Sequence, residues 1–387
     1  MRFLALPIVL GIIFSLAGVA PAVDGKKDKK SGGKIERSMA ADPKVTITLC
    51  VMSGEISVRG WDKEEVRARS ADAEQIEFRR IDKTKDVSRP ANRIDVMVLD
   101  KTDPGGTKGD CQALANVELD VPQGATVQVQ TRDGDISIVG VAAAYAGSQN
   151  GDIEIERAQR LVEAGSVGGS ISLKDSSGRI NLSSAGGGVE ASNIRATSTE
   201  DSFEVGTVSG DIQLDGVSNA KVIAKTVNGN VMMSGPLTHS GHYAFTTMSG
   251  DVTLALPPDA SFQLNAKVSQ SQEIVSDFAL TFTMDAATPP ATPKAGAHSE
   301  FGPKSSPKVQ PAPATKPSPP GVQPAPAPKV SPPKPAAKSG PVVSPIIVQR
   351  SVVVVPYAMR RITAVCGSGD ATIYVASFGG TLHLQKK

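Results

Sequence analysis

A short sequence unit recurs along the middle of the chain at intervals of about 20 residues. Each copy has the form x-Gly-polar-apolar-polar-apolar, as in DGDISI, SGDIQL and SGDVTL. The aligned glycines are Gly134, Gly151, Gly169, Gly187, Gly210, Gly229 and Gly250, separated by 17, 18, 18, 23, 19 and 21 residues. A period of this size is typical of a solenoid, in which one repeat cannot bury its apolar face without its neighbours.

Each repeat has the pattern of a strand that follows a tight turn. Two apolar residues, such as Ile136 and Ile138, stand two positions apart, so a strand places both on one face. Glycine beside Asp, Asn or Ser favours a turn. Further strand-like segments lie between the glycine-led ones, at 161–167, 179–184, 220–227 and 242–248, with no helical pattern between them. We therefore predict an all-β fold, a parallel β-solenoid similar to a β-helix, with two strands and two turns per coil.

A hydroxyl residue precedes each aligned glycine by three positions. The column consists of Thr131, Ser148, Ser166, Ser184, Thr207, Thr226 and Thr247. Because equivalent positions of stacked coils lie about 4.8 Å apart, we expect a Ser/Thr ladder that bonds up and down the stack. Residues 53–58 and 368–375 are outlying copies of the repeat. In the second of these Cys366 takes the hydroxyl position, which predicts a buried, structural thiol.

The N-terminus resembles a targeting segment. Residues 1–22 combine Arg2, an apolar run and the small residues Ala20-Pro21-Ala22, which is typical of a secretory signal peptide. The mature protein is therefore expected outside the cytoplasmic membrane of a bacterium, in the periplasm, on the cell surface or secreted. Residues 23–43 are charged and Gly-rich, and we interpret them as a flexible leader.

Composition divides the remainder into four segments. Residues 44–127 have longer, less regular strand patterns, which predict an N-terminal β cap, and residues 128–287 hold the solenoid repeats. Residues 288–345 contain 18 of the 28 prolines and seven lysines, as expected of a disordered Pro/Ala/Lys-rich linker. Residues 346–387 resume the strand pattern as the final β coils. The basic linker would suit contact with anionic surfaces, but a passive spacer whose lysines only keep it soluble is the favoured interpretation.

Several of these segments resemble a known family. They are SGEISVRGWDKEEVRARS, VELDVPQGATVQVQTRDGDISIVGV and the repeated T-[VM]-[SN]-G-[DN]. Together they are similar to the DUF4097 "putative adhesin" family of bacterial extracytoplasmic β-strand-repeat proteins, over residues 44–285 and 346–387. The resemblance implies a β-solenoid and an adhesive or envelope role, and it supplies no catalytic residues. The long Pro/Lys insertion departs from the family pattern.

An acidic column follows the repeat glycines. It comprises Glu55, Asp135, Asp152, Asp211, Asp251 and Asp370, interrupted by Ser170 and Asn230. Stacked carboxylates would suit Ca²⁺, which takes six to eight oxygen ligands. The calcium-binding nonapeptide repeat is absent, however, so Asp side chains that cap turns are the favoured interpretation.

Other candidates for chemistry are sparse. Asp201 stands beside Glu200 and near Glu204, but no His or Arg recurs around them as a polysaccharide-degrading site would need. His239 and His242 lack an evident third zinc ligand. We therefore assign no catalytic, cofactor-binding or metal-binding residue and expect no cofactor.

The cysteines leave one alternative open. Cys50 and Cys111 both lie in the N-terminal region, and an extracytoplasmic compartment permits disulfides. Spacing alone does not decide whether the two pair, because the separation of their Cα atoms is not encoded in it.

Taken together, the sequence favours a secreted, non-catalytic, envelope-associated β-solenoid that acts as an adhesion or surface-binding module. Its expected partner is an envelope polymer, a glycan or a surface protein, and not nucleic acid. The alternatives are a polysaccharide-active enzyme (lyase or glycosidase) on a β-helix, and an envelope-stress accessory protein that binds a membrane protein.

Overall fold

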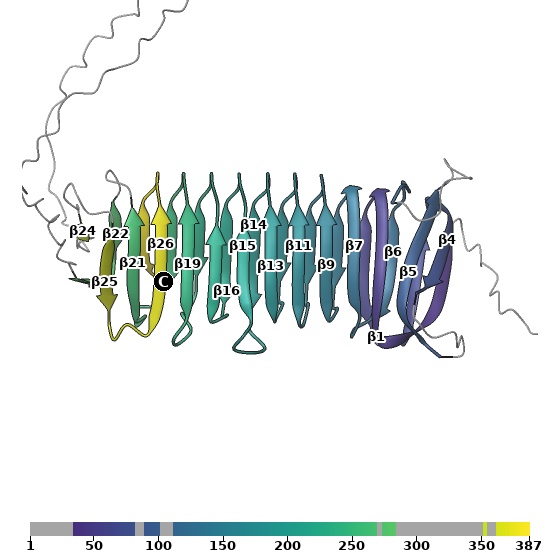
Figure 1. Cartoon of the computed structure of the whole chain (residues 1–387), viewed down its shortest axis with the longest axis horizontal. Helices are drawn as coiled ribbons and strands as arrows, with labels where there is room; N and C mark the ends of the chain where they lie inside the picture. Colours follow the sequence, from purple (N-terminus) through teal and green to yellow (C-terminus); the bar gives the residue numbers. More distant parts are fainter. Residues whose placement is uncertain (1–33, 82–88, 101–110, 269–272, 284–350, 354–360) are drawn as a thin grey trace, which may run out of the picture. The chain divides into compact units, whose positions relative to one another are not determined.

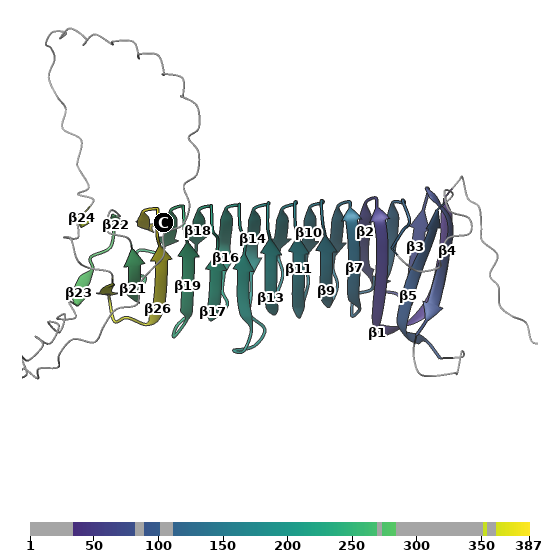
Figure 2. The ribbon, with the colours of Figure 1, turned by 45° about the horizontal axis from the view of Figure 1, so that its top comes forward.

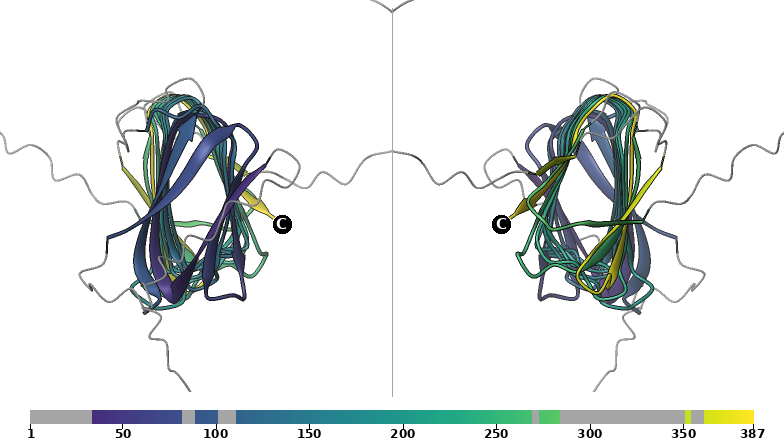
Figure 3. Two further views of the ribbon diagram at one scale, coloured as in Figure 1. Left: turned by 90° about the vertical axis from the view of Figure 1, so that its right-hand side faces the viewer. Right: turned by 90° about the vertical axis from the view of Figure 1, so that its left-hand side faces the viewer.

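The computed structural model of the chain describes residues 34–81, 89–100, 111–268, 273–283, 351–353 and 361–387. The predicted signal peptide and the predicted linker lie outside these residues. The described part is built from strands that form two sheets facing each other (Figure 3). Within it, no helix has the length and apolarity needed to cross a membrane.

The strands that follow the repeat glycines make the first sheet, here called the glycine-led sheet. With the two end regions it contains β2 (Ile56–Trp61), β3 (Glu65–Ser70), β6 (Val117–Pro122), β8 (Ile136–Val139), β10 (Ile153–Glu156), β12 (Ile171–Lys174), β14 (Val189–Ile194), β16 (Ile212–Val217), β18 (Val231–Ser234), β20 (Val252–Leu256), β22 (Ile274–Ser276), β24 (Ser351–Val353) and β27 (Leu382–Lys386).

The intervening strands make the opposite sheet. It contains β4 (Ala73–Arg80), β5 (Ala91–Asp100), β7 (Thr126–Asp133), β9 (Ala143–Ser148), β11 (Leu161–Ser166), β13 (Arg179–Ser184), β15 (Ser202–Gly206), β17 (Lys221–Lys225), β19 (His242–Thr247), β21 (Phe262–Val268), β23 (Thr281–Thr283), β25 (Ile362–Cys366) and β26 (Ala371–Ser377). The long strand β1 (Ile35–Ser53) gives its first part to the glycine-led sheet and the rest to the opposite sheet.

Parallel pairing of successive coils confirms the predicted solenoid. Strand β10 lies between β8 and β12, and β11 lies between β9 and β13, all in unbroken register. The stack therefore aligns like residues into columns, one of which runs through Ile136, Ile153, Ile171, Val189, Ile212, Val231, Val252 and Leu382. Every member is buried, so the core between the sheets consists of aliphatic stacks.

The turns that precede the glycine-led strands lie along one edge of the solenoid (Figure 2). There each repeat glycine packs against the carbonyl of the glycine one coil away. A Cβ built on Gly151 would lie 1.9 Å from the Gly134 oxygen, and one on Gly229 would lie 2.0 Å from the Gly210 oxygen. No side chain fits at such distances, so the column requires glycine.

The hydroxyl column is buried and bonds along the stack, as predicted. Six of its seven members donate to a glycine carbonyl of the adjacent coil, and Thr131 donates to the Met52 carbonyl instead. Ser166 Oγ donates to the Gly151 oxygen at 3.0 Å, and Thr247 Oγ1 donates to the Gly229 oxygen at 3.0 Å. Each hydroxyl thereby satisfies a carbonyl that the close approach of two coils would otherwise leave without a partner.

The last coil of the chain is not the last coil of the stack. Strand β26 pairs with β19 on one side and β21 on the other (Figure 1), and β27 pairs with β20 and β22. Residues 371–386 are thus inserted between coils that are consecutive in sequence. Strand β25 then pairs antiparallel with β21 beyond them.

Because of this insertion, the register predicted for the repeat copy at residues 368–375 is wrong. Gly369 and Asp370 precede β26, which belongs to the opposite sheet, so Asp370 is not part of the acidic column. Ser377, and not Cys366, continues the hydroxyl ladder, because its Oγ lies 3.5 Å from the Gly250 oxygen. Cys366 is nevertheless buried as predicted, and burial raises the pKa of its thiol.

The N-terminal end shows the same arrangement. Strands β1 and β2 form a coil that lies between β7–β8 on one side and β5–β6 on the other. The prediction of a flexible leader up to residue 43 is wrong in its last part, because residues 35–40 pair antiparallel with β3. Beyond them the antiparallel pair β4–β5 ends the opposite sheet, which is the role expected of a cap.

Cys50 and Cys111 form a disulfide with Cα atoms 4.8 Å apart, which settles the open question of their pairing. Cys50 lies in β1 and Cys111 precedes β6, 61 residues later. The bond therefore joins the inserted first coil to the segment that leads into β6, the neighbour of β2.

Replacing a column glycine should destabilise the protein strongly. We expect Gly151→Ala to lower the free energy of unfolding by about 3 kcal/mol, because the new methyl group would overlap a backbone carbonyl that cannot yield easily. Gly147→Ala is the matched control, since its Cβ would meet only Gln130 Cγ at 3.8 Å. Urea unfolding followed by circular dichroism compares the two, and equal effects would contradict the argument from close approach.

Removing the disulfide should loosen the N-terminal end. The double variant Cys50→Ser/Cys111→Ser is expected to lose about 4 kcal/mol of stability, the chain-entropy contribution of a loop of this length. Thermal unfolding with and without dithiothreitol provides the measurement. Reductant should lower the midpoint of the wild type and leave that of the double variant unchanged; the same shift in both proteins would rule the explanation out.

Candidate functional site

The acidic column that the sequence singled out bonds to the protein's own backbone. Asp135 Oδ1 accepts from the Asp152 amide at 2.9 Å, and Asp152 Oδ1 accepts from the Ser170 amide at 2.7 Å. Asn230 makes the same contact to Asp251. These side chains cap the next turn of the stack, as the structural interpretation predicted. Among the described residues, no group of three or more His, Cys, Asp or Glu could hold a metal ion.

The acidic group near Asp201 also closes a turn. Asp201 Oδ2 accepts hydrogen bonds from the Thr197 amide, the Thr197 hydroxyl and the Ser198 amide at 2.7–2.8 Å. Burial raises the pKa of Asp201, but these bonds outweigh it and the pKa lies below its usual value. Such a carboxylate stays ionised, whereas a glycosidase acid needs a raised pKa. Glu204 is engaged with Lys221 at 3.3 Å.

Within the described ranges, the two histidines are not part of a cluster that could bind a metal ion. His239 is exposed in the turn before β19, and His242 is the first residue of that strand. The structure thus brings none of the candidates from the sequence together into a reactive centre. The surfaces that could contact a ligand are the outward faces of the two sheets.

A polar hollow of about 470 Å³ lies on the outward face of the opposite sheet, over strands β1, β7, β9, β11 and β13. Gly147 and Gly165 pair with each other in register and form its floor, because neither carries a side chain. The side chains that line it and face outward are mainly amides and hydroxyls: Thr48, Gln128, Gln130, Tyr145, Asn181 and Ser183, with Glu163 as the acid. This hollow is called the amide hollow below.

A second groove, of about 600 Å³, lies on the outward face of the glycine-led sheet. Its lining is strongly acidic and includes Asp135, Asp152, Glu154, Glu190 and Asp211. Part of that charge is already engaged, because the three column carboxylates accept hydrogen bonds from backbone amides and Glu154 pairs with Lys174 at 3.1 Å. The amide hollow is therefore the better candidate, since its amide and hydroxyl groups are spread over several strands around an open floor.

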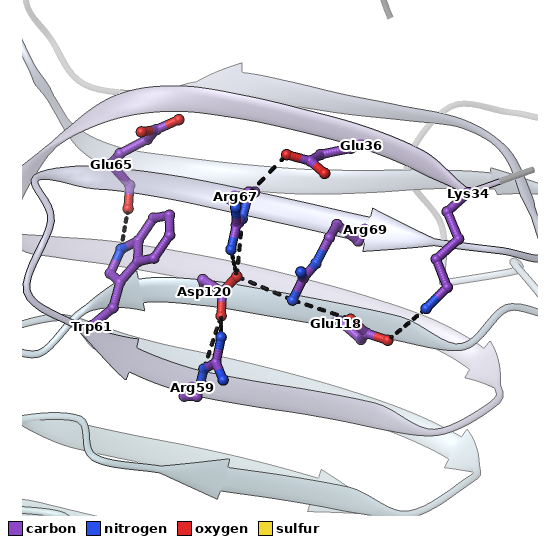
Figure 4. Close-up of polar contacts among 9 residues, drawn as sticks. All are labelled: Lys34, Glu36, Arg59, Trp61, Glu65, Arg67, Arg69, Glu118 and Asp120. Atoms are coloured by element: carbon purple, nitrogen blue, oxygen red, sulfur yellow. Dashed lines mark hydrogen bonds and ion pairs between the residues drawn. The ribbon is translucent and has the colours of Figure 1, made fainter. Parts of the chain in front are cut away.

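A buried ion cluster lies at the N-terminal end, on strands β2, β3 and β6 (Figure 4). Asp120 is only 1% exposed and receives three guanidinium groups. Arg59 and Arg67 each donate two hydrogen bonds to it, and Arg69 lies 3.2 Å from its Oδ2. Burial pushes the pKa of Asp120 up, but the bonds from Arg67 and Arg59 and the charge of Arg69 outweigh burial, so the pKa lies below its usual value.

Trp61, the second residue of the Gly-Trp pair, completes this cluster. Its Nε1 donates to the Glu65 carbonyl at 2.7 Å, and the Arg67 guanidinium lies 4.7 Å from the ring centroid (Figure 4). Sequence reasoning missed the role of Asp120 and its arginines. The alternation in VRARS places Arg67 and Arg69 on one face of a strand. This pattern could have indicated two of the three arginines of the cluster.

Neutralising Asp120 should destabilise the N-terminal end. Asp120→Asn leaves three guanidinium groups around an uncharged side chain, and we expect a loss of about 3 kcal/mol at pH 7. Because the folded pKa is lowered, the contribution of Asp120 is complete above its unfolded pKa and disappears as the pH falls through the folded value. Urea unfolding from pH 7 to pH 2 should therefore show the two proteins converging in acid.

Glu118→Gln is the control for this series. Glu118 contacts Lys34 and Arg69 in the same cluster but is about half exposed, so its removal should change stability by less than about 1 kcal/mol. A larger effect of Glu118→Gln than of Asp120→Asn would show that burial of Asp120 is not what makes the cluster stabilising.

Comparisons with known proteins place the chain in a family. Two similar solved structures are a "putative adhesin" from Parabacteroides merdae (10% identity, TM-score 0.36, covering 58% of this chain and 90% of that chain) and a "putative cell adhesion protein" from Clostridium sporogenes (8% identity, TM-score 0.17, covering 91% and 99%). No curated protein matches the sequence. The model of the family described as Toastrack DUF4097 matches residues 54–285, more than half of the chain, and confirms the resemblance seen in the sequence. The protein therefore belongs to the Toastrack DUF4097 family.

Proposed function

We propose that the protein is a non-catalytic, extracytoplasmic surface-binding module that holds a hydroxyl-rich envelope glycan against the outward face of the opposite sheet. The observation that carries this proposal is the amide hollow. Its amides and hydroxyls both donate and accept hydrogen bonds, which is the capacity that sugar hydroxyl groups require.

The shape and charge of the amide hollow support a neutral ligand. Gly147 and Gly165 leave the backbone of two neighbouring strands uncovered, so a flat ring can approach the sheet closely. Tyr145 presents an aromatic ring with a polar tip beside them. Among the described residues that line the hollow, Glu163 is the one carboxylate and none is a lysine or an arginine.

The solenoid also favours a polymeric ligand. Neighbouring coils repeat the same outward positions along a straight stack, so a chain of sugars can contact several coils at once. Repeated weak contacts of this kind raise the overall affinity without any single strong site. The signal-peptide pattern of residues 1–22 and the adhesive role implied by the family resemblance support an envelope location. A basic linker would add a further contact with anionic surfaces.

Filling the amide hollow should abolish glycan binding. Gly147→Gln places a polar side chain on its floor, where a Cβ is tolerated, and we expect about a tenfold or larger loss of affinity for neutral glycans. A glycan array identifies the ligand, and calorimetry with the mature protein measures the change. Ser172→Gln, on the outward face of the glycine-led sheet, is the matched control and should bind normally.

A reducing-end assay on the same glycans tests the non-catalytic part of the proposal, and no turnover is expected. Failure of the wild type to bind any glycan, or equal affinity of Gly147→Gln and Ser172→Gln, would overturn the proposed function.

A further inference from the structure

Two aromatic side chains stand exposed on the inserted last coil. Tyr374, Ala376 and Phe378 alternate with buried residues along β26 and the residue that follows it, so all three face outward on the opposite sheet. Tyr374 and Phe378 are each 50% exposed, although the chain has only 15 aromatic residues among 387. Large apolar side chains gathered on a polar surface commonly mark a binding site.

A hollow of about 340 Å³ opens beside the Tyr374 ring, which belongs to its lining. Strand β26 lies between β19 and β21, so Tyr374 is flanked by Ala244 and Asn265, and Ala376 is flanked by Thr246 and Lys267. Because Ala244 and Ala376 have small side chains, the surface next to the Tyr374 ring is recessed. The amide and hydroxyl groups add hydrogen-bonding capacity at the same place.

The charge of this hollow is positive. Lys267 and Arg361 both belong to its lining, and none of the described residues that line it is acidic. Ile362 pairs antiparallel with Ala266, so Arg361 and Lys267 come to adjacent positions on neighbouring strands. Like charges placed in this way repel each other and favour an anion between them.

The basic groups also lie close to the aromatic ones. Lys267 Nζ is 5.8 Å from the centroid of the Phe378 ring. In the part of the chain that the structure describes, no ion pair to Lys267 or Arg361 is formed. The two cations therefore remain available to a ligand.

We propose that this basic, aromatic hollow binds an acidic sugar of a polysaccharide. The sugar ring lies against the face of Tyr374 while its carboxylate is held by Arg361 and Lys267, because a guanidinium pairs with a carboxylate through two parallel hydrogen bonds. This ligand differs from the neutral one of the amide hollow, whose described lining residues include Glu163 and neither lysine nor arginine. This inference rests on the proposed function in one respect only, which is that the protein contacts glycans.

The site exists because of the insertion of the last coil. Its residues come from β19, from β21, from β26 and from Arg361 just before β25, and β26 places Tyr374 between β19 and β21. A solenoid stacked in simple chain order would not bring them together.

Calorimetry of the mature protein with oligogalacturonate tests the proposal, and the methyl-esterified oligomer is the neutral matched ligand. We expect the acid to bind and the ester to bind about tenfold more weakly or not at all, with an affinity for the acid that falls as salt is added. The double variant Lys267→Gln/Arg361→Gln should lose about tenfold or more in affinity for the acid, and Tyr374→Ser should also weaken binding.

Lys225→Gln is the control, since Lys225 is an exposed lysine of the same sheet outside the hollow. Equal binding of acid and ester, or no difference between the double variant and this control, would overturn the proposal. Binding to phosphatidylglycerol vesicles without binding to oligogalacturonate would also overturn it, in favour of a lipid surface. Binding of neutral glycans tests the proposed function separately. That binding should be lost in Gly147→Gln and kept in the double variant.

Discussion

The close approach of adjacent coils at the glycine turns is the constraint on which the rest of the structure depends. There the backbone of one coil lies where a Cβ of the next would be, and the repeat glycines make this contact possible. The approach fixes how each coil sits on its neighbour, and the buried hydroxyls and the capping carboxylates then satisfy the polar groups it encloses. Once the turns are aligned, parallel pairing places aliphatic residues over aliphatic residues along the core.

A stack of this kind must also end, and both ends are closed in a related way. The first and the last coil in sequence are each inserted one place inward, and antiparallel strands lie beyond them. At the N-terminal end, the buried Asp120 of β6 binds Arg59 of the inserted coil and Arg67 of β3. The disulfide joins Cys50 of the same coil to Cys111, which precedes β6. These contacts lie where a solenoid would otherwise expose unpaired edges.

Because alternate residues of every strand face outward, the scaffold leaves its surface free to vary. The opposite sheet carries neutral amides around bare glycines near one end and a basic pair beside the Tyr374 ring near the other. Neither hollow disturbs the columns inside. The function of such a fold therefore depends on outward positions that the packing of the core does not constrain.

The sequence by itself determined the period, the glycine and hydroxyl columns and the face on which each strand residue lies, because these follow from local alternation and turn chemistry. It did not determine which coils are neighbours at the two ends of the stack, where chain order is broken. Residues 368–375 read as a glycine-led copy, yet they lead into the opposite sheet, since local pattern fixes a strand's faces and not its partners. The Asp120 cluster and the hollow at Tyr374 join segments far apart in sequence, so only the tertiary structure, through non-local strand pairing, brought their side chains together.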